Sequence, residues 1–383
     1  MVSLGTVAVG QSGGPTAVIN ASLAGVIDAA RQTGSPVLGL RYGIQGALHH
    51  DIIDLSGADV SALRDTVSAA LGSVRYKLKP EDYDGVLDAF RRHDVHSFIY
   101  IGGNDSMDTA DQLAKLAEQR GLDLRVIGVP KTIDNDLPFT DHCPGFPSAA
   151  RYVAALVRDV GLDARAMRRT YFLEIMGRHA GWLTAASRLA RDRDDAAPHV
   201  ILLPEHEWDG VRFMSAVEHA QRQYGHCVVA VAEGFELGGE AANLGTVDSF
   251  GHFKLGGVGH QLAGLTRQLL GLPAEPPCDV LGYAQRASSL GRSVTDVKEA
   301  FEVGRRAVEA AATGETGKMV TIVREGEQPY HAGYGFVPLT EAANRTRTLD
   351  ERYFSPEHYD VEEGFLSYLQ PLVGPLATPY RLY

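Results

Sequence analysis

Hydrophobic residues along the chain form short apolar runs that alternate with longer segments of helical period. In the first third of the chain, the runs occupy residues 5–10, 36–40, 97–103 and 125–130, and the helical segments occupy residues 16–34 and 108–121. Alternation of this kind predicts βαβ units, whose parallel strands are buried beneath helices on both faces.

The same alternation resumes further along, with apolar runs at residues 170–176, 199–204 and 227–234 and helical segments at residues 180–190 and 210–225. A second complete series indicates a second lobe rather than one very wide sheet. The predicted fold class is therefore α/β, with two doubly wound Rossmann-like lobes, largely parallel sheets and an active cleft between the lobes.

The Pro/Gly-rich segment CPGFPSAA, residues 143–150, marks the expected boundary between the lobes. We therefore assign residues 1–145 to the first lobe and residues 146–285 to the second. After about residue 325 the alternation becomes irregular. Residues 311–383 are expected to form a peripheral C-terminal segment that packs on the second lobe or at an interface.

Composition and charge narrow the class of protein. The 383 residues, 44% of them hydrophobic, suffice for two cores, and the formal net charge of −12 argues against a nucleic-acid partner, which would need a basic face. Cys143, Cys227 and Cys278 are far apart and odd in number, so we expect reduced thiols. No apolar run reaches the roughly 18 residues of a membrane helix, and no basic segment precedes an apolar run at the amino terminus. A cytoplasmic protein without membrane contact is expected.

Residues that directly follow the apolar runs are unusual, and ligands of doubly wound folds bind at such strand ends. Gly13 and Gly14 follow the first run and allow the backbone to approach an anion closely at a helix start. Gly103, Asp105 and Ser106 follow the third run, where a phosphate and its metal could bind. Helix capping alone would also explain Asp105 or Ser106.

A third loop, GVPKTIDNDLP at residues 128–138, combines a lysine with three Asp or Asn side chains. A turn could use one or two such side chains to satisfy its own backbone. Three exceed that need. Lys131, Thr132, Asp134 and Asp136 are therefore candidates for holding a metal-bound phosphate and for accepting a proton from a hydroxyl.

The second series has a similar concentration of polar residues. Arg178 and His179 lie between a strand and a helix, and Glu233 ends another strand. A surface arginine or a core histidine would explain either of the first two by itself. Because they occur together with the glycine loops, their joint arrangement indicates an active site.

Seven segments, in this order, resemble the phosphofructokinase family: SGGPTAVINA, LGSVRYKL, GGNDSMDTA, PKTIDND, MGRHAGW, AEGFE and YAQRAS. The resemblance covers residues 4–310 and is closest to the bacterial pyrophosphate-dependent branch. It implies reversible transfer of a phosphoryl group from pyrophosphate to the 1-hydroxyl of fructose 6-phosphate, giving fructose 1,6-bisphosphate. It also implies Mg²⁺ as cofactor and a homodimer or homotetramer, in which a neighbouring subunit completes each sugar site.

The resemblance assigns roles in the first lobe, the phosphoryl-donor lobe, which a segment near residues 285–310 would complete. Asp134 would take the proton from the sugar hydroxyl, and Asp136 would orient that hydroxyl and bind Mg²⁺ together with Asp105. Thr132 and Arg75 would contact the transferring phosphoryl group. The donor-binding residues would be Gly13, Gly14, Gly103, Asp105, Ser106 and Lys131.

The second lobe, the sugar-phosphate lobe, would bind the acceptor. Its substrate-binding residues would be Arg169, Met176, Gly177, Arg178, Glu233, Tyr283 and Arg286. Of these, Arg169 and Arg286 would hold the phosphate of the sugar, and Glu233 would accept hydrogen bonds from its hydroxyls.

Asp105 and Lys131 favour pyrophosphate over ATP, because family members that use ATP have glycine at both positions. Asp105 would fill the space that a nucleotide's α-phosphate needs, and Lys131 adds positive charge for a compact anion. Asn104 stands where many relatives have aspartate, which leaves the set of Mg²⁺ ligands open.

Two departures from the family leave the acceptor open. Pro277 stands at the position of a family arginine, and Tyr283 at that of a histidine, so two basic groups for the sugar phosphate are missing. Arg267 and Arg292 are candidate replacements. Fructose 6-phosphate remains the expected acceptor, with sedoheptulose 7-phosphate or an epimeric hexulose phosphate as the alternative, and ATP as the alternative donor.

Other classes of protein fit the sequence less well. A nicotinamide-dependent dehydrogenase would need G-x-G-x-x-G after the first strand, and kinases with a GGDGT-like loop would not account for PKTIDND or MGRHAG. A catalytically silent protein that binds sugar phosphates as a regulator would not need Asp134, Asp136 and Arg75. A phosphoryl-transfer assay separates that last alternative from an enzyme.

Overall fold

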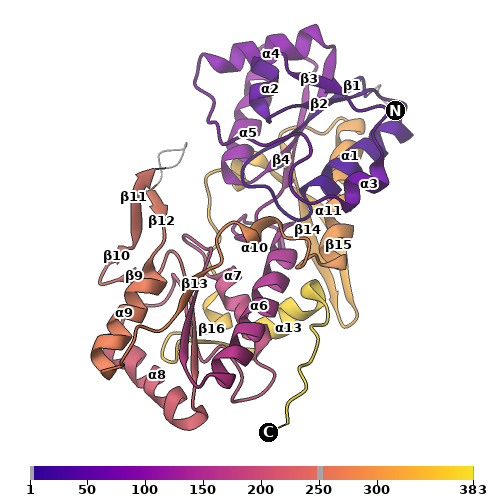
Figure 1. Ribbon diagram of the computed structural model, residues 1–383. Coiled ribbons are helices and arrows are strands. Elements are labelled where there is room, and N and C mark those ends of the chain that lie inside the picture. The colour runs from indigo at the N-terminus through magenta and orange to yellow at the C-terminus, as the bar shows by residue number, and fades with distance from the viewer. Residues whose placement is uncertain (1–3, 248–252, 383) are drawn as a thin grey trace. The chain divides into compact units, whose positions relative to one another are not determined.

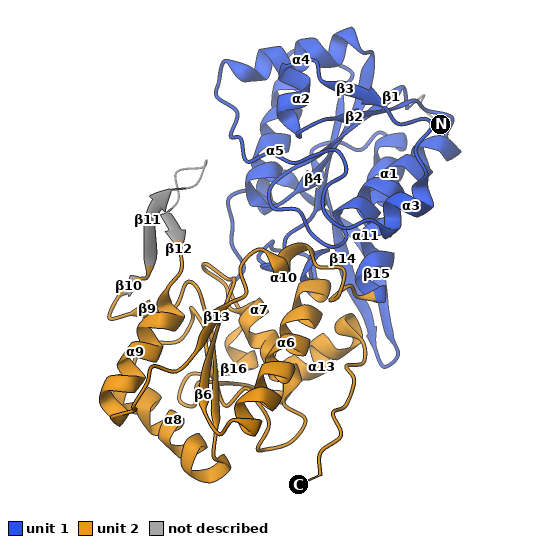
Figure 2. Ribbon diagram, viewed as in Figure 1, with its two compact units in different colours: residues 1–146, 294–347 blue, residues 147–293, 348–383 orange. Residues whose placement is uncertain are grey.

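The computed structural model describes residues 4–247 and 253–382, which form two compact units (Figure 1). Unit 1 consists of Met1–Phe146 and Val294–Arg347, and unit 2 of Pro147–Ser293 and Thr348–Tyr383 (Figure 2). Each unit is therefore assembled from two separate stretches of the chain.

A mixed sheet with helices on both faces makes up unit 1. Its strands are β1 (Thr6–Gln11), β2 (Val37–Leu40), β3 (Ile52–Asp54), β4 (Val95–Gly102), β5 (Arg125–Pro130), β14 (Lys318–Glu327) and β15 (Tyr330–Pro338). Its helices are α1 (Ile19–Gln32), α2 (Ile44–Leu48), α3 (Val60–Asp65), α4 (Asp82–Arg92), α5 (Asn104–Gln119), α11 (Val294–Ala312) and α12 (Leu339–Ala342). The strand order is β15-β14-β5-β4-β1-β2-β3, and all neighbours are parallel except the edge strands β3 and β15.

The central strands of unit 1 are buried on both faces. In β1, Val7 and Val9 pack in the cluster that contains α1 and α11, whereas Ala8 packs in the cluster that contains α2, α4 and α5. Burial on both sides explains why these strands read as continuous apolar runs rather than as an alternating pattern. The predicted doubly wound α/β class is confirmed.

Helix α11 reaches unit 1 from far along the sequence and packs closely on α1. A Cβ atom at Gly25 would lie 2.0 Å from the carbonyl oxygen of Phe301, and one at Gly304 would lie 2.1 Å from that of Ser22. Only glycine permits this approach of the two backbones, because any side chain would overlap a carbonyl group. The pair of glycines therefore fixes where the second stretch of unit 1 joins the first.

A parallel sheet forms the centre of unit 2. Its strands are β6 (Thr170–Ile175), β7 (Val200–Leu202), β8 (Cys227–Ala232) and β13 (Cys278–Val280), in the order β13-β6-β8-β7. Its helices are α6 (Phe146–Ala166), α7 (Trp182–Ala185), α8 (Gly210–Tyr224), α9 (Val258–Leu270), α10 (Ala284–Ala287) and α13 (Glu363–Val373), with the 3₁₀ turns η1 (Ala186–Ala190) and η2 (Glu351–Tyr353). Short paired strands are β9 (Glu236–Leu237) with β10 (Glu240–Ala241), β11 (Asn243–Val247) with β12 (Phe253–Leu255), and β16 (Phe354–Ser355) with β17 (Asp360–Val361).

Helices also flank the sheet of unit 2. Phe213 of α8 and Leu262 of α9 share a core with Phe172 and Val229 of the strands, and Figure 1 shows α6 and α13 on the opposite side. The ends of α8 follow local rules: the Asp209 carboxylate accepts hydrogen bonds from the first turn, and Gly225 ends the helix at a left-handed φ of 77°.

The prediction for the C-terminal segment needs correction. Residues 318–338 form β14 and β15, which belong to the sheet of unit 1, so this part of residues 311–383 is not peripheral. The completing segment of unit 1 is also longer than residues 285–310, since it spans Val294–Arg347. An antiparallel hairpin at a sheet edge is only half covered, and its mixed polar pattern therefore hid it from a search for buried runs.

The last stretch of the chain belongs to unit 2. Trp182 of α7 lies among the rings of Tyr353, Phe365 and Tyr368, with centroid separations of 6.0, 6.2 and 5.8 Å. The C-terminal residues therefore pack against the start of the helix that follows β6.

Two simpler expectations can be compared with the structure. Cys143, Cys227 and Cys278 are all free thiols, as expected. Within residues 4–247 and 253–382, no helix combines the length and the apolar character needed to span a membrane.

Candidate functional site

Three loops of unit 1 lie together at the carboxyl ends of its parallel strands. The register pairs Gln11 of β1 with Ile101 of β4, and Gly102 of β4 with Pro130 of β5. Since neighbouring strands are about 4.8 Å apart, the residues that follow these pairs begin side by side. The structure thus brings together the three predicted donor loops.

Lys131 and the first glycine loop are in direct contact. The Lys131 side chain is only 3% exposed, and its Nζ donates a 2.9 Å hydrogen bond to the carbonyl oxygen of Gly14. Gly13 has a φ of +75°, and a Cβ there would lie 3.0 Å from Nζ. Glycine suits this left-handed backbone, and a side chain there would crowd the ammonium group. A buried positive charge therefore lies beneath the first loop.

The segment that contains Arg75 lies against the same glycine loop. The backbone N–H of Gly13 donates to the carbonyl of Val74 over 3.0 Å, and the Ser73 hydroxyl donates to the carbonyl of Gly13 over 2.5 Å. Arg75 itself is exposed. The structure therefore places Arg75 next to the predicted donor loops, although it is about 60 residues away from Gly13 in sequence.

The second glycine loop continues directly into α5. Gly103 is the N-cap residue, and no side chain caps the helix, so the capping interpretation of Asp105 and Ser106 is wrong. Asp105 lies in the first turn, where the helix dipole favours a negative charge, and Ser106 is buried. Both side chains are thus available for roles other than capping.

The third loop has a specific internal geometry. Asn135 adopts a left-handed φ of 56°, and its side-chain oxygen accepts a 2.9 Å hydrogen bond from the N–H of Cys143. The Thr132 hydroxyl accepts from the N–H of Asp134 over 3.1 Å and hydrogen-bonds the Asp136 carboxylate. Asn135, between the two aspartates of TIDND, thus serves the turn itself, and the carboxylates of Asp134 and Asp136 remain for chemistry.

Asp136 has an unusual electrostatic environment. Burial raises the pKa of this carboxyl group, whereas the Thr132 hydroxyl and the charges of Arg347 and Lys131 act in the opposite direction. The Asn104 amide also donates a 3.0 Å hydrogen bond to Asp136 Oδ2. Positive charge and hydrogen-bond donors therefore surround a carboxylate that water solvates poorly.

Residues suited to Mg²⁺ lie at this point. Asn104 Oδ1 is buried and accepts no hydrogen bond within the described residues, while its amide nitrogen is bound to Asp136. A hard cation prefers such oxygens, and Mg²⁺ usually takes only one or two protein carboxylates beside substrate phosphates and water. The part of the chain that the structure describes contains no cluster of three or more His, Cys, Asp or Glu side chains suited to a metal. The residues present fit a Mg²⁺ that binds together with a phosphate.

Predicted acceptor residues of unit 2 gather at the carboxyl end of its sheet. Ile175 of β6 pairs with Ala232 of β8, so Met176 and Glu233 follow neighbouring strand ends. The buried Gln285 side chain accepts from the N–H of Met176 over 3.2 Å and donates to the carbonyl of Gly282 over 2.8 Å. This amide ties the turn before α10 to the end of β6.

Further close contacts complete this group. The N–H of Gly234 donates to the carbonyl of Gly177, and a Cβ at Gly234 would lie 1.9 Å from the carbonyl oxygen of Arg178. In the same turn as Gln285, the Arg286 guanidinium lies over the Tyr283 ring, 4.8 Å from its centroid. Gly177, Arg178, Tyr283 and Arg286 thus lie at the same edge as Met176 and Glu233.

Arg169 lies elsewhere in unit 2. It precedes β6, at the amino end of the sheet, and six strand residues at about 3.3 Å each put it roughly 20 Å from Met176. Arg169 is paired with Asp163 and lies over the Tyr171 ring at 5.2 Å. Pro277 is at this same edge, since its carbonyl accepts from the N–H of Phe172. Within one chain, the structure does not bring Arg169 together with Arg286.

The structure does not assign Arg267 or Arg292, the proposed replacements for the missing basic groups, to sugar-phosphate binding. Arg267 lies in the last turn of α9, about 14 Å along the helix from Val258. Arg292 lies in the loop that precedes α11.

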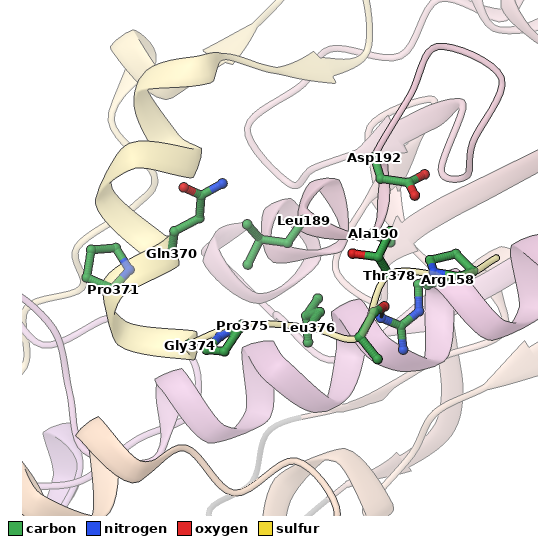
Figure 3. A pocket seen from close by; sticks show the side chains of 12 residues that line it. Arg158, Leu189, Ala190, Asp192, Gln370, Pro371, Gly374, Pro375, Leu376 and Thr378 are labelled. Carbon is green, nitrogen blue, oxygen red and sulfur yellow. Dashed lines mark hydrogen bonds between the residues drawn. The ribbon is translucent and has the colours of Figure 1, made fainter.

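A cavity of about 500 Å³ in unit 2 is separate from all of these residues (Figure 3). The residues that line it are Arg158, Leu189, Ala190, Asp192, Gln370, Pro371, Gly374, Pro375, Leu376, Ala377, Thr378 and Pro379. Its charged groups already have partners, because Arg158 donates to the carbonyl of Ala377 and Asp192 accepts two hydrogen bonds from Arg381. We therefore do not assign the candidate site to this cavity.

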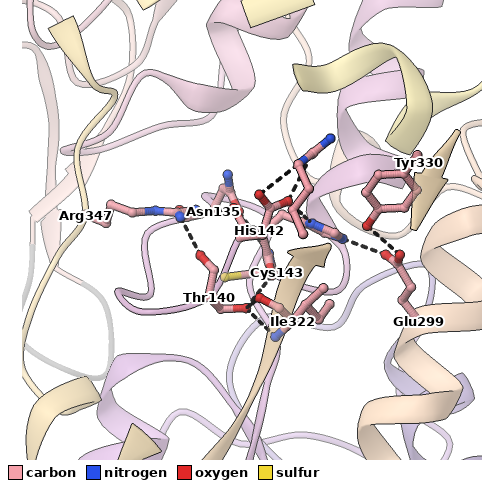
Figure 4. Close-up of polar contacts among 10 residues, drawn as sticks. Asn135, Thr140, His142, Cys143, Glu299, Ile322, Tyr330 and Arg347 are labelled. Carbon is pink, nitrogen blue, oxygen red and sulfur yellow. Dashed lines mark hydrogen bonds and ion pairs between the residues drawn. The ribbon is translucent and has the colours of Figure 1, made fainter. Parts of the chain in front are cut away.

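Sequence reasoning missed the ionic network beneath the third loop (Figure 4). His142 is fully buried and contacts Asp141 over 2.8 Å and Glu299 over 2.6 Å. Two nitrogens of Arg324 donate to Asp141 over 3.0 Å, and the Tyr330 hydroxyl donates to Glu299 over 2.6 Å. A histidine next to an aspartate and a cysteine carried no signal of this role, because Glu299 comes from α11, and Arg324 and Tyr330, which bind the two carboxylates, come from the hairpin.

Contacts within this network shift the pKa values of His142 and Asp141. Burial by itself would lower the pKa of His142, but Glu299 and Asp141 outweigh it and raise this pKa to about 9. Burial would raise the pKa of Asp141, but hydrogen bonds from His142 and Arg324 lower it to about 2. His142 is therefore positively charged at neutral pH.

Known proteins share both the sequence and the fold of this chain. Residues 6–311 match the family described as PFK: Phosphofructokinase. A pyrophosphate--fructose 6-phosphate 1-phosphotransferase of Halomonas elongata is 41% identical over 381 residues, which is 95% of this chain and 90% of the relative. A sulfofructose kinase of Alkalicoccus urumqiensis is 34% identical over 380 residues, 97% of each protein. The solved structure of a pyrophosphate-dependent phosphofructokinase from Nitrosospira multiformis matches with a TM-score of 0.88 at 37% identity, covering 100% of this chain and 95% of that one.

Protonated His142 should make stability depend on pH. Its folded pKa of about 9 exceeds the ordinary value of 6.5, so the stabilisation is fully present below pH 6.5 and is lost as the pH rises through 9. The difference corresponds to on the order of 3 kcal/mol. We expect the free energy of unfolding in urea to fall over this interval, and His142→Gln to be less stable at pH 6.5 with a flatter dependence. An equal dependence of the free energy of unfolding on pH in wild type and His142→Gln would contradict this expectation.

Proposed function

The chain belongs to the phosphofructokinase family, and on that premise we propose that it transfers a phosphoryl group from pyrophosphate to the 1-hydroxyl of fructose 6-phosphate. The observation that carries the proposal is that Lys131 is buried beneath the Gly13–Gly14 loop, in the same segment as the TIDND carboxylates, and that its charge acts on Asp136. Together they supply a base and a site for a compact polyanion. The names of the relatives at about 40% identity support the same reaction.

The first step of the proposed mechanism is proton removal. Asp134 takes the proton of the sugar 1-hydroxyl while that oxygen forms a bond to the nearer phosphorus of pyrophosphate. The bond from this phosphorus to the bridging oxygen breaks, and inorganic phosphate leaves with the bonding electron pair. The base and the oriented substrates are sufficient, because phosphoryl transfer depends on positioning and charge neutralisation more than on covalent catalysis.

Residues of unit 1 are proposed to bind the donor and orient the hydroxyl. Asp136 holds the hydroxyl for attack, while Thr132 and Arg75 contact the transferring group. Backbone N–H groups of the two glycine loops and the Ser106 hydroxyl contact phosphate oxygens. The ammonium of Lys131 offsets their charge, and the side chain of Asp105 occupies space that a nucleotide would need.

Mg²⁺ is the proposed cofactor, and Asn104, Asp105 and Asp136 are the residues that would hold it. When bound, the ion supplies positive charge that neutralises the phosphate oxygens. Support comes from the buried Asn104 oxygen, which accepts no hydrogen bond in the described residues and lies beside the Asp136 carboxylate.

Residues of unit 2 are proposed to bind fructose 6-phosphate. Met176, Gly177 and Arg178 shape the sugar pocket, Glu233 accepts from its hydroxyls, and Arg286, with the Tyr283 ring against it, binds its phosphate. Arg169 lies at the other edge of the sheet, which favours action on the sugar of a neighbouring subunit in a homodimer or homotetramer.

Loss of the base provides the first test. Asp134→Ser should lower kcat by about 10²- to 10⁴-fold, the usual contribution of a general base, with little change in KM for the sugar. Asp88→Ser is a matched control, because Asp88 is an exposed helical residue paired only with Arg91 in the described contacts. Near-normal turnover of Asp134→Ser would refute its assignment as the base.

Choice of donor is the second test. The wild-type protein should turn over pyrophosphate and not ATP, and its reaction should run readily in reverse. Lys131→Met should raise KM for pyrophosphate by roughly 10- to 100-fold, since a charge-assisted contact contributes about 1.5–3 kcal/mol. Lys115→Met is the control: it removes a half-exposed ammonium from α5 and should leave KM for pyrophosphate unchanged. Turnover with ATP alone would favour the alternative donor.

Acceptor preference is tested by comparing kcat/KM for fructose 6-phosphate, sedoheptulose 7-phosphate, an epimeric hexulose phosphate and sulfofructose, the sugar in the name of the Alkalicoccus urumqiensis relative. We expect fructose 6-phosphate to be preferred, and Arg286→Met to raise its KM about tenfold or more through the loss of one charged contact. Arg222→Met is the control, because Arg222 is exposed in the last turn of α8 and pairs with Glu218. A clear preference for another sugar would refute fructose 6-phosphate as the acceptor.

A further inference from the structure

Arg347 contacts the third loop at residues 135–136 and the segment that follows it at residues 140–141. No sequence motif predicted these contacts. Its Nε and Nη2 donate to the carbonyl of Asn135 over 3.2 and 2.9 Å, and its Nη1 donates to the carbonyls of Thr140 and Asp141 over 2.6 and 3.0 Å. Its backbone N–H donates to the carbonyl of Asp136 over 2.7 Å. One residue therefore binds four carbonyl groups, which belong to residues 135–136 and 140–141; Figure 4 shows its contact with Thr140.

The two sides of the loop differ in how firmly they are attached. The N–H of Asp141 donates to the carbonyl of Ile322 over 2.8 Å, and the N–H of Ile322 donates to the Thr140 hydroxyl over 2.9 Å. Asp141 is also bound by Arg324 and His142. The side at residues 140–142 is thus fixed to β14, a strand of the main sheet.

The side at Asn135 and Asp136 carries the chemistry. Asn135 has a left-handed backbone that its own side chain stabilises at Cys143. Its carbonyl and that of Asp136 both accept from Arg347. The guanidinium consequently connects the catalytic side of the loop to the side that β14 holds.

We propose that Arg347 is a positioning residue for phosphoryl transfer, which holds the Asp134–Asp136 turn in its reactive geometry by binding loop carbonyls on both sides. The expected effect of Arg347 on the reaction rate rests on the proposed function. Its expected effect on the conformation of the loop does not. Arg347 acts through the loop backbone, so it is not itself a catalytic residue. The fork of guanidinium N–H groups reaches separate carbonyls at fixed angles, which the single ammonium of lysine does not reproduce.

Kinetics of three variants test the effect on rate. Arg347→Ala and Arg347→Lys should each lower kcat about 100-fold, the cost of displacing reacting groups by about 1 Å, with KM values within about threefold of wild type. Millimolar guanidinium should restore part of the activity of Arg347→Ala and none of that of Arg347→Lys. Arg345→Ala is the matched control, because Arg345 is exposed, lies two residues away and pairs with Glu341. The rates are measured with whichever donor the wild-type protein uses.

Hydrogen exchange tests the effect on the loop independently of any reaction. Peptides that cover residues 131–145 should exchange faster in Arg347→Ala and Arg347→Lys than in wild type, while peptides from β1 and β4 should remain unchanged. A protein that is inactive with every donor would refute the proposed function and leave this comparison intact. Unchanged exchange in this loop, kcat within threefold of wild type, or an equal loss in Arg345→Ala would overturn the proposal.

Discussion

Compensation of buried negative charge in residues 131–145 is the constraint on which the rest of unit 1 depends. This loop carries Asp134, Asp136 and Asp141 in a protein with a formal net charge of −12. A carboxylate removed from water is costly unless cations and hydrogen-bond donors replace the solvent. Four side chains supply that replacement, and only two of them come from the loop itself: Lys131, His142, Arg324 and Arg347.

The second stretch of unit 1, Val294–Arg347, supplies two of these cations from far along the sequence. Helix α11 packs on α1 through two glycines, and β14 then adds to the sheet beside β5. This route brings Arg324 to Asp141 and, after α12, Arg347 to the loop. The hairpin is therefore an edge of the sheet and also part of the support for the loop. A truncated first stretch would have the carboxylates without two of these four side chains, Arg324 and Arg347.

In unit 2, buried side chains accept hydrogen bonds from the backbone of nearby turns. Gln285 and Glu174 are buried, and each holds backbone N–H groups: Gln285 binds Met176, and Glu174 binds Gly257 and Gly259. Such contacts fix the turns that follow the strands of this sheet. Phosphoryl transfer needs this rigidity, because most of its acceleration comes from orientation and from fixed charge rather than from covalent chemistry.

The sequence by itself determined the two α/β series, the glycine loops and the TIDND carboxylates, because buried parallel strands and strand-end loops leave local patterns. Only the tertiary structure decided that β14 and β15 join the first sheet, that Arg169 and Arg286 lie at opposite edges of the second, and that Asn135 serves the turn. It alone revealed His142 and Arg347 as supports of the loop. Their partners lie about 150 to 210 residues away in sequence, and no local pattern encodes a contact whose two sides meet only when distant strands and helices pack together.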